Sequence, residues 1–319
     1  MKKIFKILTG LFLLTLVSLI LLGYSGIGNL TKNNAKNGTF ININNEEIRY
    51  IQKGEGQDIL LIHGTPGCLE DWDLITDYLS KNYRVTAFDR LGNSYTSSNN
   101  YNYTLKENAA VVHQLIDTLK LKNIVVIGHS YGGSTTAQLA VEDNPKIDSY
   151  ILVAPPLYGI NPGILYKIAS IPVIGKGFAY LMYITKAKGV IRETYKSSMG
   201  SKPELLTEEF LNFRTDVLSQ PKVLYTTSNE RTNYNDGLDK IAPKYSEITK
   251  KVSIIVGDSD YQNLMDGCDK FKRVRPQTEL LILKNTGHFV QMEKTELLLG
   301  FIDSHLKTRN LERNRDAEN

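Results

Sequence analysis

Short hydrophobic runs recur along most of the chain, each bounded by glycine, asparagine or aspartate. The runs cover residues 59–63, 83–88, 124–127, 150–153, 252–256 and 280–283. Aliphatic runs of this length without polar alternation are typical of strands that are buried on both faces of a sheet. The pattern therefore predicts a series of internal strands.

Helical patterns lie between these runs. The clearest one spaces its hydrophobic residues at alternating steps of four and three, which places them on one face of a helix: Leu105, Ala109, Val112, Ile116 and Leu119. Alternation of strands and helices predicts an α/β fold, with a mostly parallel sheet flanked by helices.

Two further strands are expected ahead of this alternating region. Residues 40–43 and 48–51 are rich in isoleucine and aromatic residues, and Asn44-Asn45 between them is a good sequence for a tight turn. We expect a hairpin here and place the start of the folded core near Thr39. Residues 29–38, rich in asparagine, are predicted to form a polar linker.

One long interval breaks the alternation. Residues 155–250 contain no convincing buried strand, and a loop of that length would need structure of its own. Helix-like patterns occur at 164–171, 178–185 and 204–218. We predict a helical cap inserted into a core formed by residues 39–154 and 251–306, followed by a polar, frayed tail at 307–319.

The N-terminus carries a membrane signal. Lys2, Lys3 and Lys6 precede an uncharged run over residues 7–28, which is long enough to span a bilayer. A retained transmembrane anchor and a cleavable signal peptide share these features, so residues 1–28 have two interpretations. In both, the basic end remains in the cytoplasm. The folded domain is then extracytoplasmic, anchored by one helix or secreted after cleavage.

Composition narrows the class of protein. With 38 basic and 34 acidic residues the formal net charge is +4, and 41% of the residues are hydrophobic, as in an ordinary folded protein. Three of the basic residues lie at the extreme N-terminus, so the rest of the chain has no electrostatic reason to bind nucleic acid. Cys68 and Cys268 form no metal-binding or redox motif, and the sequence leaves their pairing open.

The strongest chemical signal follows the run at 124–127. It leads directly into Gly128-His129-Ser130-Tyr131-Gly132, and residues 134–141 then have a helical pattern. A serine on a sharp strand-to-helix turn needs small residues two positions before and after it, and the turn exposes its hydroxyl. We predict Ser130 as a nucleophile.

A serine nucleophile needs a base, and the sequence offers five histidines. His288 follows the run at 280–283, in a loop at the carboxyl end of a strand, where functional groups gather in such sheets. We predict His288 as the base. His63 also ends a strand, and we expect it to hold its own loop by hydrogen bonds. No third ligand accompanies these two histidines, so no metal site is expected.

The acid that orients the base is expected at another strand end. Gly257-Asp258-Ser259-Asp260 follows the run at 252–256 and offers two carboxylates. Asp260 lies further from the strand, so its chain segment has room to curl back across the strand tips. We predict Asp260 as the acid and Asp258 as a turn-capping residue.

Taken together, these motifs resemble the α/β-hydrolase superfamily, in its serine-hydrolase branch with a cap inserted after the sixth core strand. The resemblance covers about residues 40–306, and its motifs occur in the family order: His63 to Gly67, Asp89 to Gly92, Gly128 to Gly132, Gly257 to Asp260, and Gly287 to Phe289. It implies that the backbone N–H groups of Thr65 and Tyr131 form an oxyanion hole. It also implies that no cofactor is required.

Departures from known relatives limit the expected chemistry. Relatives that hydrolyse epoxides or haloalkanes use an aspartate nucleophile, whereas this chain has Ser130. Carbon–carbon bond hydrolases often have asparagine before the serine, and here that residue is His129. Ser94 stands where many relatives have glycine. Trp72 resembles an aromatic residue often found near the site mouth, and core packing is the alternative.

The expected function is an esterase-like or lipase-like serine hydrolase that acts on a carboxylic ester. Apolar and aromatic residues of the cap favour a small-molecule ester with an apolar acyl or aromatic group. These residues include Tyr158, Tyr166, Tyr180, Tyr183 and Tyr195. Two alternatives stay open: hydrolysis of an amide, thioester or carbon–carbon bond on the same triad, or a ligand-binding or signalling protein that retains the fold.

Overall fold

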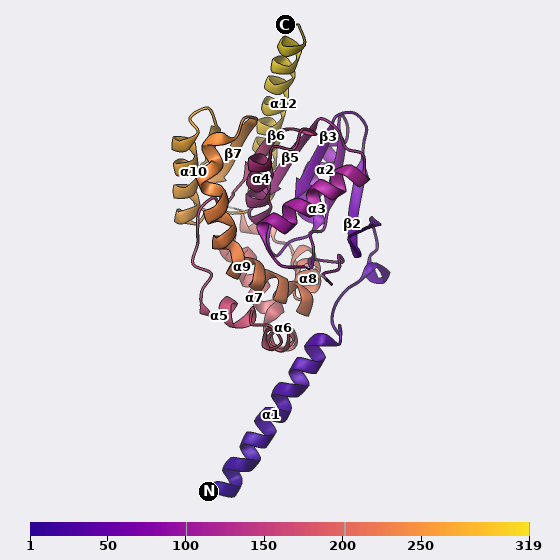
Figure 1. Ribbon diagram of the computed structural model, residues 1–319, viewed down its shortest axis with the longest axis vertical. Coiled ribbons are helices and arrows are strands. Elements are labelled where there is room, and N and C mark those ends of the chain that lie inside the picture. Colours follow the sequence, from indigo (N-terminus) through magenta and orange to yellow (C-terminus); the bar gives the residue numbers. More distant parts are fainter. Residues whose placement is uncertain (100, 201, 319) are drawn as a thin grey trace.

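An eight-stranded sheet forms the centre of the molecule (Figure 1). The computed structural model describes residues 1–99, 101–200 and 202–318. The strands lie in the order β1-β2-β4-β3-β5-β6-β7-β8. Their bounds are β1 (Thr39–Ile43), β2 (Glu46–Lys53), β3 (Asp58–Ile62), β4 (Arg84–Phe88), β5 (Ile124–His129), β6 (Ile147–Val153), β7 (Lys251–Gly257) and β8 (Glu279–Leu283).

The six strands from β4 to β8 in this order pair in parallel, while β1 and β2 are antiparallel at one edge. Every strand predicted from the hydrophobic runs is present. The hairpin is present as well, and Asn44 and Asn45 both have positive φ, at 52° and 64°. Asparagine tolerates this conformation better than most residues, which suits a two-residue turn.

Helices surround the sheet and fill the long interval between β6 and β7. Their bounds are α1 (Lys2–Tyr24), α2 (Asp73–Leu79), α3 (Leu105–Thr118), α4 (Tyr131–Glu142), α5 (Ile164–Ala169), α6 (Ile174–Thr185), α7 (Ala187–Ser198), α8 (Glu208–Leu218), α9 (Pro221–Ile241), α10 (Gln262–Val274), α11 (Val290–Glu293) and α12 (Thr295–Glu318). Short 3₁₀ helices lie at Lys32–Asn34, Leu69–Trp72, Pro203–Leu205 and Ala242–Glu247.

Alternate side chains of the central strands enter two separate cores, one on each face of the sheet. On β3, Leu60 and Ile62 join the core that includes α3, α4 and α10, whereas Ile59 and Leu61 join the core beneath α2 and α12. Successive side chains of a strand point to opposite faces. Burial on both faces therefore explains why the strand sequences are continuously hydrophobic.

The interval from 155 to 250, here called the cap segment, contains the five helices α5 to α9. They gather at the end of the molecule where the central parallel strands have their carboxyl ends (Figure 1). The long helix α9 packs against α3 and α4 of the core, and α6 packs against α9. The hydrophobic patterns indicated α5, α6 and α8 but not α7 or α9.

The C-terminal segment differs from expectation. A frayed tail was predicted at 307–319, whereas helix α12 continues to Glu318. Leucine, arginine and glutamate in this segment are good helix formers, and the helix extends from a packed first half that includes Leu298 and Ile302. Residue 319 lies outside the described residues.

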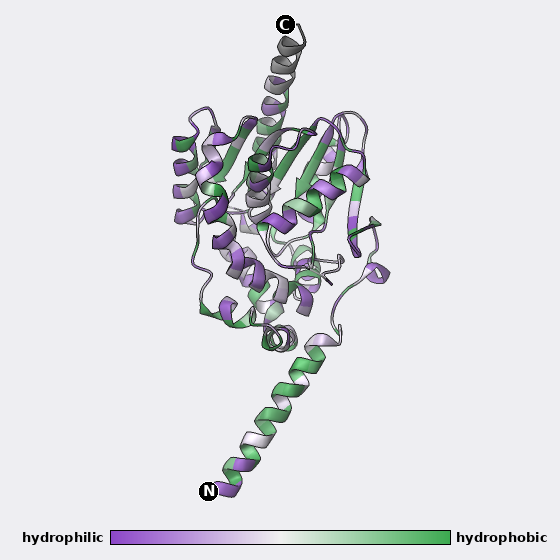
Figure 2. Ribbon diagram, in the orientation of Figure 1, coloured by the Kyte–Doolittle hydropathy of each residue, from purple (hydrophilic) through white to green (hydrophobic). Residues whose placement is uncertain are grey.

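The N-terminal helix α1 projects from the body at the end occupied by the cap segment (Figure 1). It has 23 residues, and its most apolar 18-residue stretch has a mean hydropathy of 2.4 with none of that stretch buried. Figure 2 shows it as the longest hydrophobic helix of the molecule. Length and composition suit either a membrane anchor or a signal sequence.

Candidate active site

Ser130 lies on the turn between β5 and α4, at the carboxyl end of the central strand. Its backbone has φ 53° and ψ −121°, a conformation that side-chain-bearing residues rarely adopt. The flanking glycines make the turn possible. A Cβ at Gly128 would lie 2.2 Å from the Gly132 carbonyl oxygen, and one at Gly132 would lie 2.3 Å from that of Ile62. The turn leaves the Ser130 side chain partly exposed.

The structure brings the three residues predicted as catalytic into one chain of hydrogen bonds. The Ser130 hydroxyl lies 2.9 Å from Nε2 of His288 and can donate its proton there. On the other side of the ring, Nδ1–H of His288 donates to Asp260, at 2.9 Å from Oδ2 and 3.0 Å from Oδ1. A base that is oriented by a carboxylate and touches a serine hydroxyl can remove the proton from that hydroxyl.

The two candidate carboxylates have different surroundings. The Asp260 side chain is fully buried beside His288 and also accepts a hydrogen bond from the backbone N–H of Tyr261. Asp258 is exposed, and its carboxylate accepts from Ser259 and from the backbone N–H of Thr286. Only Asp260 contacts the imidazole, which agrees with the expectation that Asp258 caps a turn.

His129, next to Ser130 in sequence, supports the loop that carries His288. Its Nε2–H donates to the backbone carbonyl of His288 at 2.9 Å, and the two rings lie 4.9 Å apart. Burial and the adjacent His288 lower the pKa of His129 to about 3. His129 is therefore neutral at physiological pH and adds no charge next to the base.

The other histidines lie outside this hydrogen-bond chain. His63 is buried, and it links its own loop to the next one: Nδ1–H donates to the Gly64 carbonyl, and Nε2 accepts from the backbone N–H of Arg90. Burial and the nearby Arg90 guanidinium hold the pKa of His63 well below its usual value. His113 pairs with Glu142 on the surface, and His305 bonds to serines of β6 and β7.

The loop after β3 approaches the serine turn closely. A Cβ at Gly64 would lie 3.1 Å from that of Ser130, so the adjacent Thr65 lies beside the turn. Tyr131 begins helix α4, and the first backbone N–H groups of a helix have no partner within the helix. These are the two residues whose N–H groups the sequence resemblance assigns to an oxyanion hole.

A buried ion pair beside Thr65 joins the loop after β4 to the cap segment, and sequence reasoning missed it. Glu230 of α9 binds Arg90 through two hydrogen bonds of 2.6 and 3.0 Å, and it accepts a third from the Thr65 hydroxyl. Burial opposes the charged guanidinium, but Glu230 holds the pKa of Arg90 above its usual value. Arg90 stands in one of the recognised motifs, whereas no motif marks Glu230.

Helix α7 of the cap segment also contacts the site. The backbone carbonyl of Ser198 accepts from the backbone N–H of His288 at 2.8 Å. The ring of Tyr195 stacks on that of Phe289, with centroids 4.8 Å apart. Of the five cap tyrosines named from the sequence, Tyr195 is thus the one stacked beside the His288 loop.

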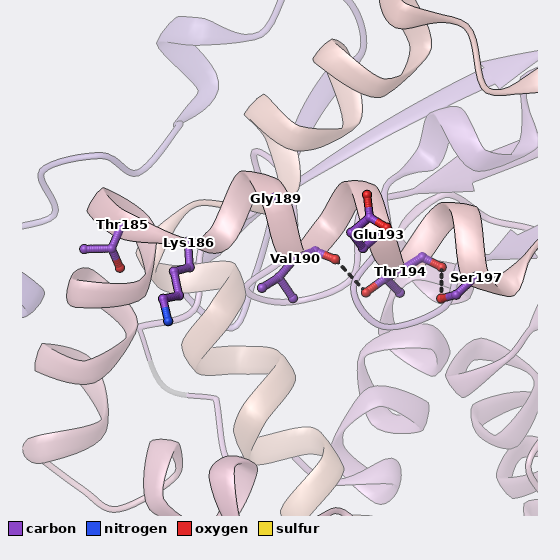
Figure 3. A pocket seen from close by; sticks show the side chains of 7 residues that line it. All are labelled: Thr185, Lys186, Gly189, Val190, Glu193, Thr194 and Ser197. Carbon is purple, nitrogen blue, oxygen red and sulfur yellow. Dashed lines mark hydrogen bonds between the residues drawn. The ribbon is translucent and has the colours of Figure 1, made fainter.

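A hollow of about 640 Å³ lies on the opposite, outward face of α7 (Figure 3). Its lining residues come from α7 and the end of α6: Thr185, Lys186, Gly189, Val190, Glu193, Thr194 and Ser197. None of them belongs to the hydrogen-bond chain at Ser130. We therefore separate this surface hollow from the candidate active site.

Two sequence questions are settled by burial. Trp72 is fully buried in the core beneath α2, as the core-packing alternative expected. Cys68 and Cys268 are both buried and free, so they do not pair. Within residues 1–99, 101–200 and 202–318, no group of three or more His, Cys, Asp or Glu side chains is arranged to hold a metal ion.

A parallel sheet with a serine turn at the carboxyl end of its central strand defines the class of protein. The chain belongs to the α/β hydrolase fold family, whose sequence profile matches residues 59–295. This confirms the superfamily and the fold class expected from the motifs.

Individual relatives are distant. The dihydrolipoyllysine-residue acetyltransferase component of the acetoin cleaving system of Cupriavidus necator is 25% identical over 273 residues, which are 84% of this chain and 68% of that protein. The 2-hydroxy-6-oxo-6-phenylhexa-2,4-dienoate hydrolase of Comamonas testosteroni is 23% identical over 78% of this chain and 87% of that protein. The crystal structure of the enol-lactonase from Burkholderia xenovorans matches with a TM-score of 0.71 at 19% identity, covering 84% of this chain and all of that one.

Proposed function

We propose that this protein is a serine hydrolase that cleaves carboxylic esters with an apolar acyl or aromatic group. The observation that carries the proposal is the continuous hydrogen-bond chain from Ser130 through His288 to Asp260. Ser130, at one end of these hydrogen bonds, lies on a turn that exposes its hydroxyl. The turn is at the carboxyl end of the parallel strands, where ligands bind in such folds.

In the proposed mechanism, Ser130 Oγ attacks the ester carbonyl while His288 Nε2 takes the hydroxyl proton. Asp260 keeps the other ring proton on Nδ1 and stabilises the imidazolium. The backbone N–H groups of Thr65 and Tyr131 donate to the oxyanion of the tetrahedral intermediate. His288 then gives its proton to the leaving alcohol, and an acyl-enzyme on Ser130 remains. Water, deprotonated by His288, releases the acid and restores the serine.

We also propose that α1 is a retained anchor that holds the hydrolase domain on the extracytoplasmic side of a membrane. Lys2, Lys3 and Lys6 precede the apolar stretch, whereas only Lys32 and Lys36 follow closely after it. The positive-inside bias favours a cytoplasmic N-terminus. The last turn of α1 also packs tightly against α6 of the folded body, as described below.

Turnover of a ladder of aryl esters, from short to long acyl chains, tests the ester proposal. Full-length protein in detergent is compared with Ser130→Ala and with Ser304→Ala, an exposed serine of α12. We expect Ser130→Ala to lose on the order of 10³-fold or more in kcat and Ser304→Ala to keep wild-type rates. Equal turnover in both variants would contradict the proposal. The preferred chain length would report the size of the acyl site.

A second activity is favoured by one comparison. The Comamonas testosteroni relative bears the name of a hydrolase of a phenylhexadienoate, and it matches this chain over most of both lengths. Hydrolysis of the carbon–carbon bond of a related vinylogous diketone could use the same Ser130 and His288. Turnover of such a compound, with no turnover of any ester in the ladder, would favour this activity over ester hydrolysis.

A further inference from the structure

The cap segment leaves many large hydrophobic side chains in contact with solvent. Eight of them, here called the α5–α6 face, lie on α5, on α6 and in the turn between them: Ile164, Leu165, Ile168, Ile171, Val173, Ile174, Leu181 and Ile184. Ile164 and Leu165 are 68% and 66% exposed. Helices α5 and α6 pack against each other, and exposed clusters of large apolar side chains mark interaction sites.

The position of this face relative to α1 indicates what covers it. Helix α6 crosses the last turns of α1 so closely that a Cβ at Gly177 would lie 3.1 Å from the backbone nitrogen of Ile20. A Cβ at Gly23 would lie 2.4 Å from the Lys176 carbonyl oxygen. Figure 1 shows α5 and α6 at the end of the body from which α1 leaves.

The length of α1 determines where α6 lies relative to the bilayer surface. A helix of 23 residues is about 35 Å long, and the hydrocarbon layer of a bilayer is about 30 Å thick. Because α1 needs nearly all of its residues to span that layer, its last turn lies at the membrane surface. Helix α6, which packs on that turn, must lie at the same level.

Charge on the cap segment fits a membrane with anionic lipids. From Ser149 to Arg192 the sequence has no aspartate or glutamate but five basic residues: Lys167, Lys176, Lys186, Lys188 and Arg192. Lys188 and Arg192 pair with acidic residues of α8, whereas Lys167 and Lys186 are exposed next to the apolar side chains. The Lys176 ammonium lies 4.3 Å from the centroid of the Tyr24 ring, and lysine and tyrosine are both favoured at the membrane–water interface.

We propose that the α5–α6 face docks on the bilayer surface, with its isoleucines and leucines among the acyl chains and its lysines at anionic headgroups. This inference rests on the proposed anchor role of α1 and does not depend on catalysis. It deepens the proposed function, because a cap that touches the bilayer places the site beside esters dissolved in the membrane. The substrate class is then an amphipathic, lipid-like ester.

Depth-dependent fluorescence quenching tests this docking on the full-length chain in vesicles. A single cysteine, Leu165→Cys, carries an environment-sensitive fluorophore, and quenchers are attached to lipid acyl chains. Leu74→Cys on α2, also strongly exposed, is the matched control. Both native cysteines are buried, so labelled wild type gives the background. We expect several-fold stronger quenching at 165 than at 74, whereas equal quenching at the two positions would overturn the proposal.

Two further sets of variants test whether the lysines and the catalytic serine contribute to docking. Lys167→Glu with Lys186→Glu should weaken quenching at 165 on vesicles with anionic lipid, whereas the surface control Lys120→Glu should not. Unchanged quenching in the double variant would overturn the headgroup contact. Ser130→Ala should quench like wild type at 165, so loss of esterase activity and loss of docking are read independently.

Discussion

At the scale of single residues, the two aspartates after β7 provide the sharpest comparison. Asp260 is buried against His288, whereas Asp258 is exposed two residues away. Asp260→Asn should lower kcat by about 10³- to 10⁴-fold, because an amide no longer holds the required tautomer of His288. Asp258→Asn should change kcat by no more than a few fold. Steady-state kinetics on one aryl ester measures both, and a larger loss in Asp258→Asn would reverse the assignment.

The buried His129 predicts a dependence of stability on pH. Its pKa is about 3 in the folded protein and about 6.5 in an unfolded chain, so between these values only the unfolded state binds the proton. The contribution of His129 to the free energy of unfolding is therefore fully present above about pH 6.5. It falls as the pH drops, by up to about 1.4 kcal/mol per pH unit.

His129→Gln should reduce that dependence, because glutamine does not titrate and its amide can still donate toward the His288 carbonyl. Thermal unfolding midpoints between pH 7 and pH 4 would show a shallower decline in the variant than in wild type. Parallel declines would mean that His129 is protonated without cost in the folded protein.

At the scale of elements, the ion pair between α9 and the loop after β4 links the cap segment to the proposed oxyanion hole. Glu230→Gln keeps the size of the side chain but removes the charge opposite Arg90 and weakens the contact with Thr65. We expect kcat to fall by about tenfold or more with a smaller change in KM, since a misplaced donor weakens the transition state most. Glu208→Gln, at an exposed ion pair of α8, is the control and should leave kcat unchanged.

The same elements show what a sequence can and cannot predict. Each central strand was recognisable because burial on both faces demands a continuous hydrophobic run. The Ser130 turn was recognisable because glycines stand two positions before and after the serine, where a sharp strand-to-helix turn needs small residues. Helix α9 was missed because it packs on its neighbours with polar residues such as Thr226 and Glu230, which give no hydrophobic period. The partner of Thr65 could not be found either, since the two residues lie 165 positions apart.

At the scale of the whole molecule, the fate of α1 decides how the protein meets its substrate. A retained anchor predicts that protein extracted from membranes has the full chain mass of 35.9 kDa. Intact-mass spectrometry of the membrane fraction checks this directly. A mature protein that lacks the first 23 to 28 residues would instead identify the helix as a signal peptide, and the docking of the α5–α6 face would then lose its support.

The central claim is that Ser130 becomes acylated during ester cleavage, and one measurement tests it most directly. Full-length protein is mixed with an aryl ester, quenched with acid within the first turnovers and digested, and the peptide that contains Ser130 is weighed by mass spectrometry. The account predicts an added acyl mass on Ser130, accompanied by one equivalent of released alcohol and absent in Ser130→Ala. Steady alcohol release with an unmodified Ser130, or an acyl group on another residue, would contradict it.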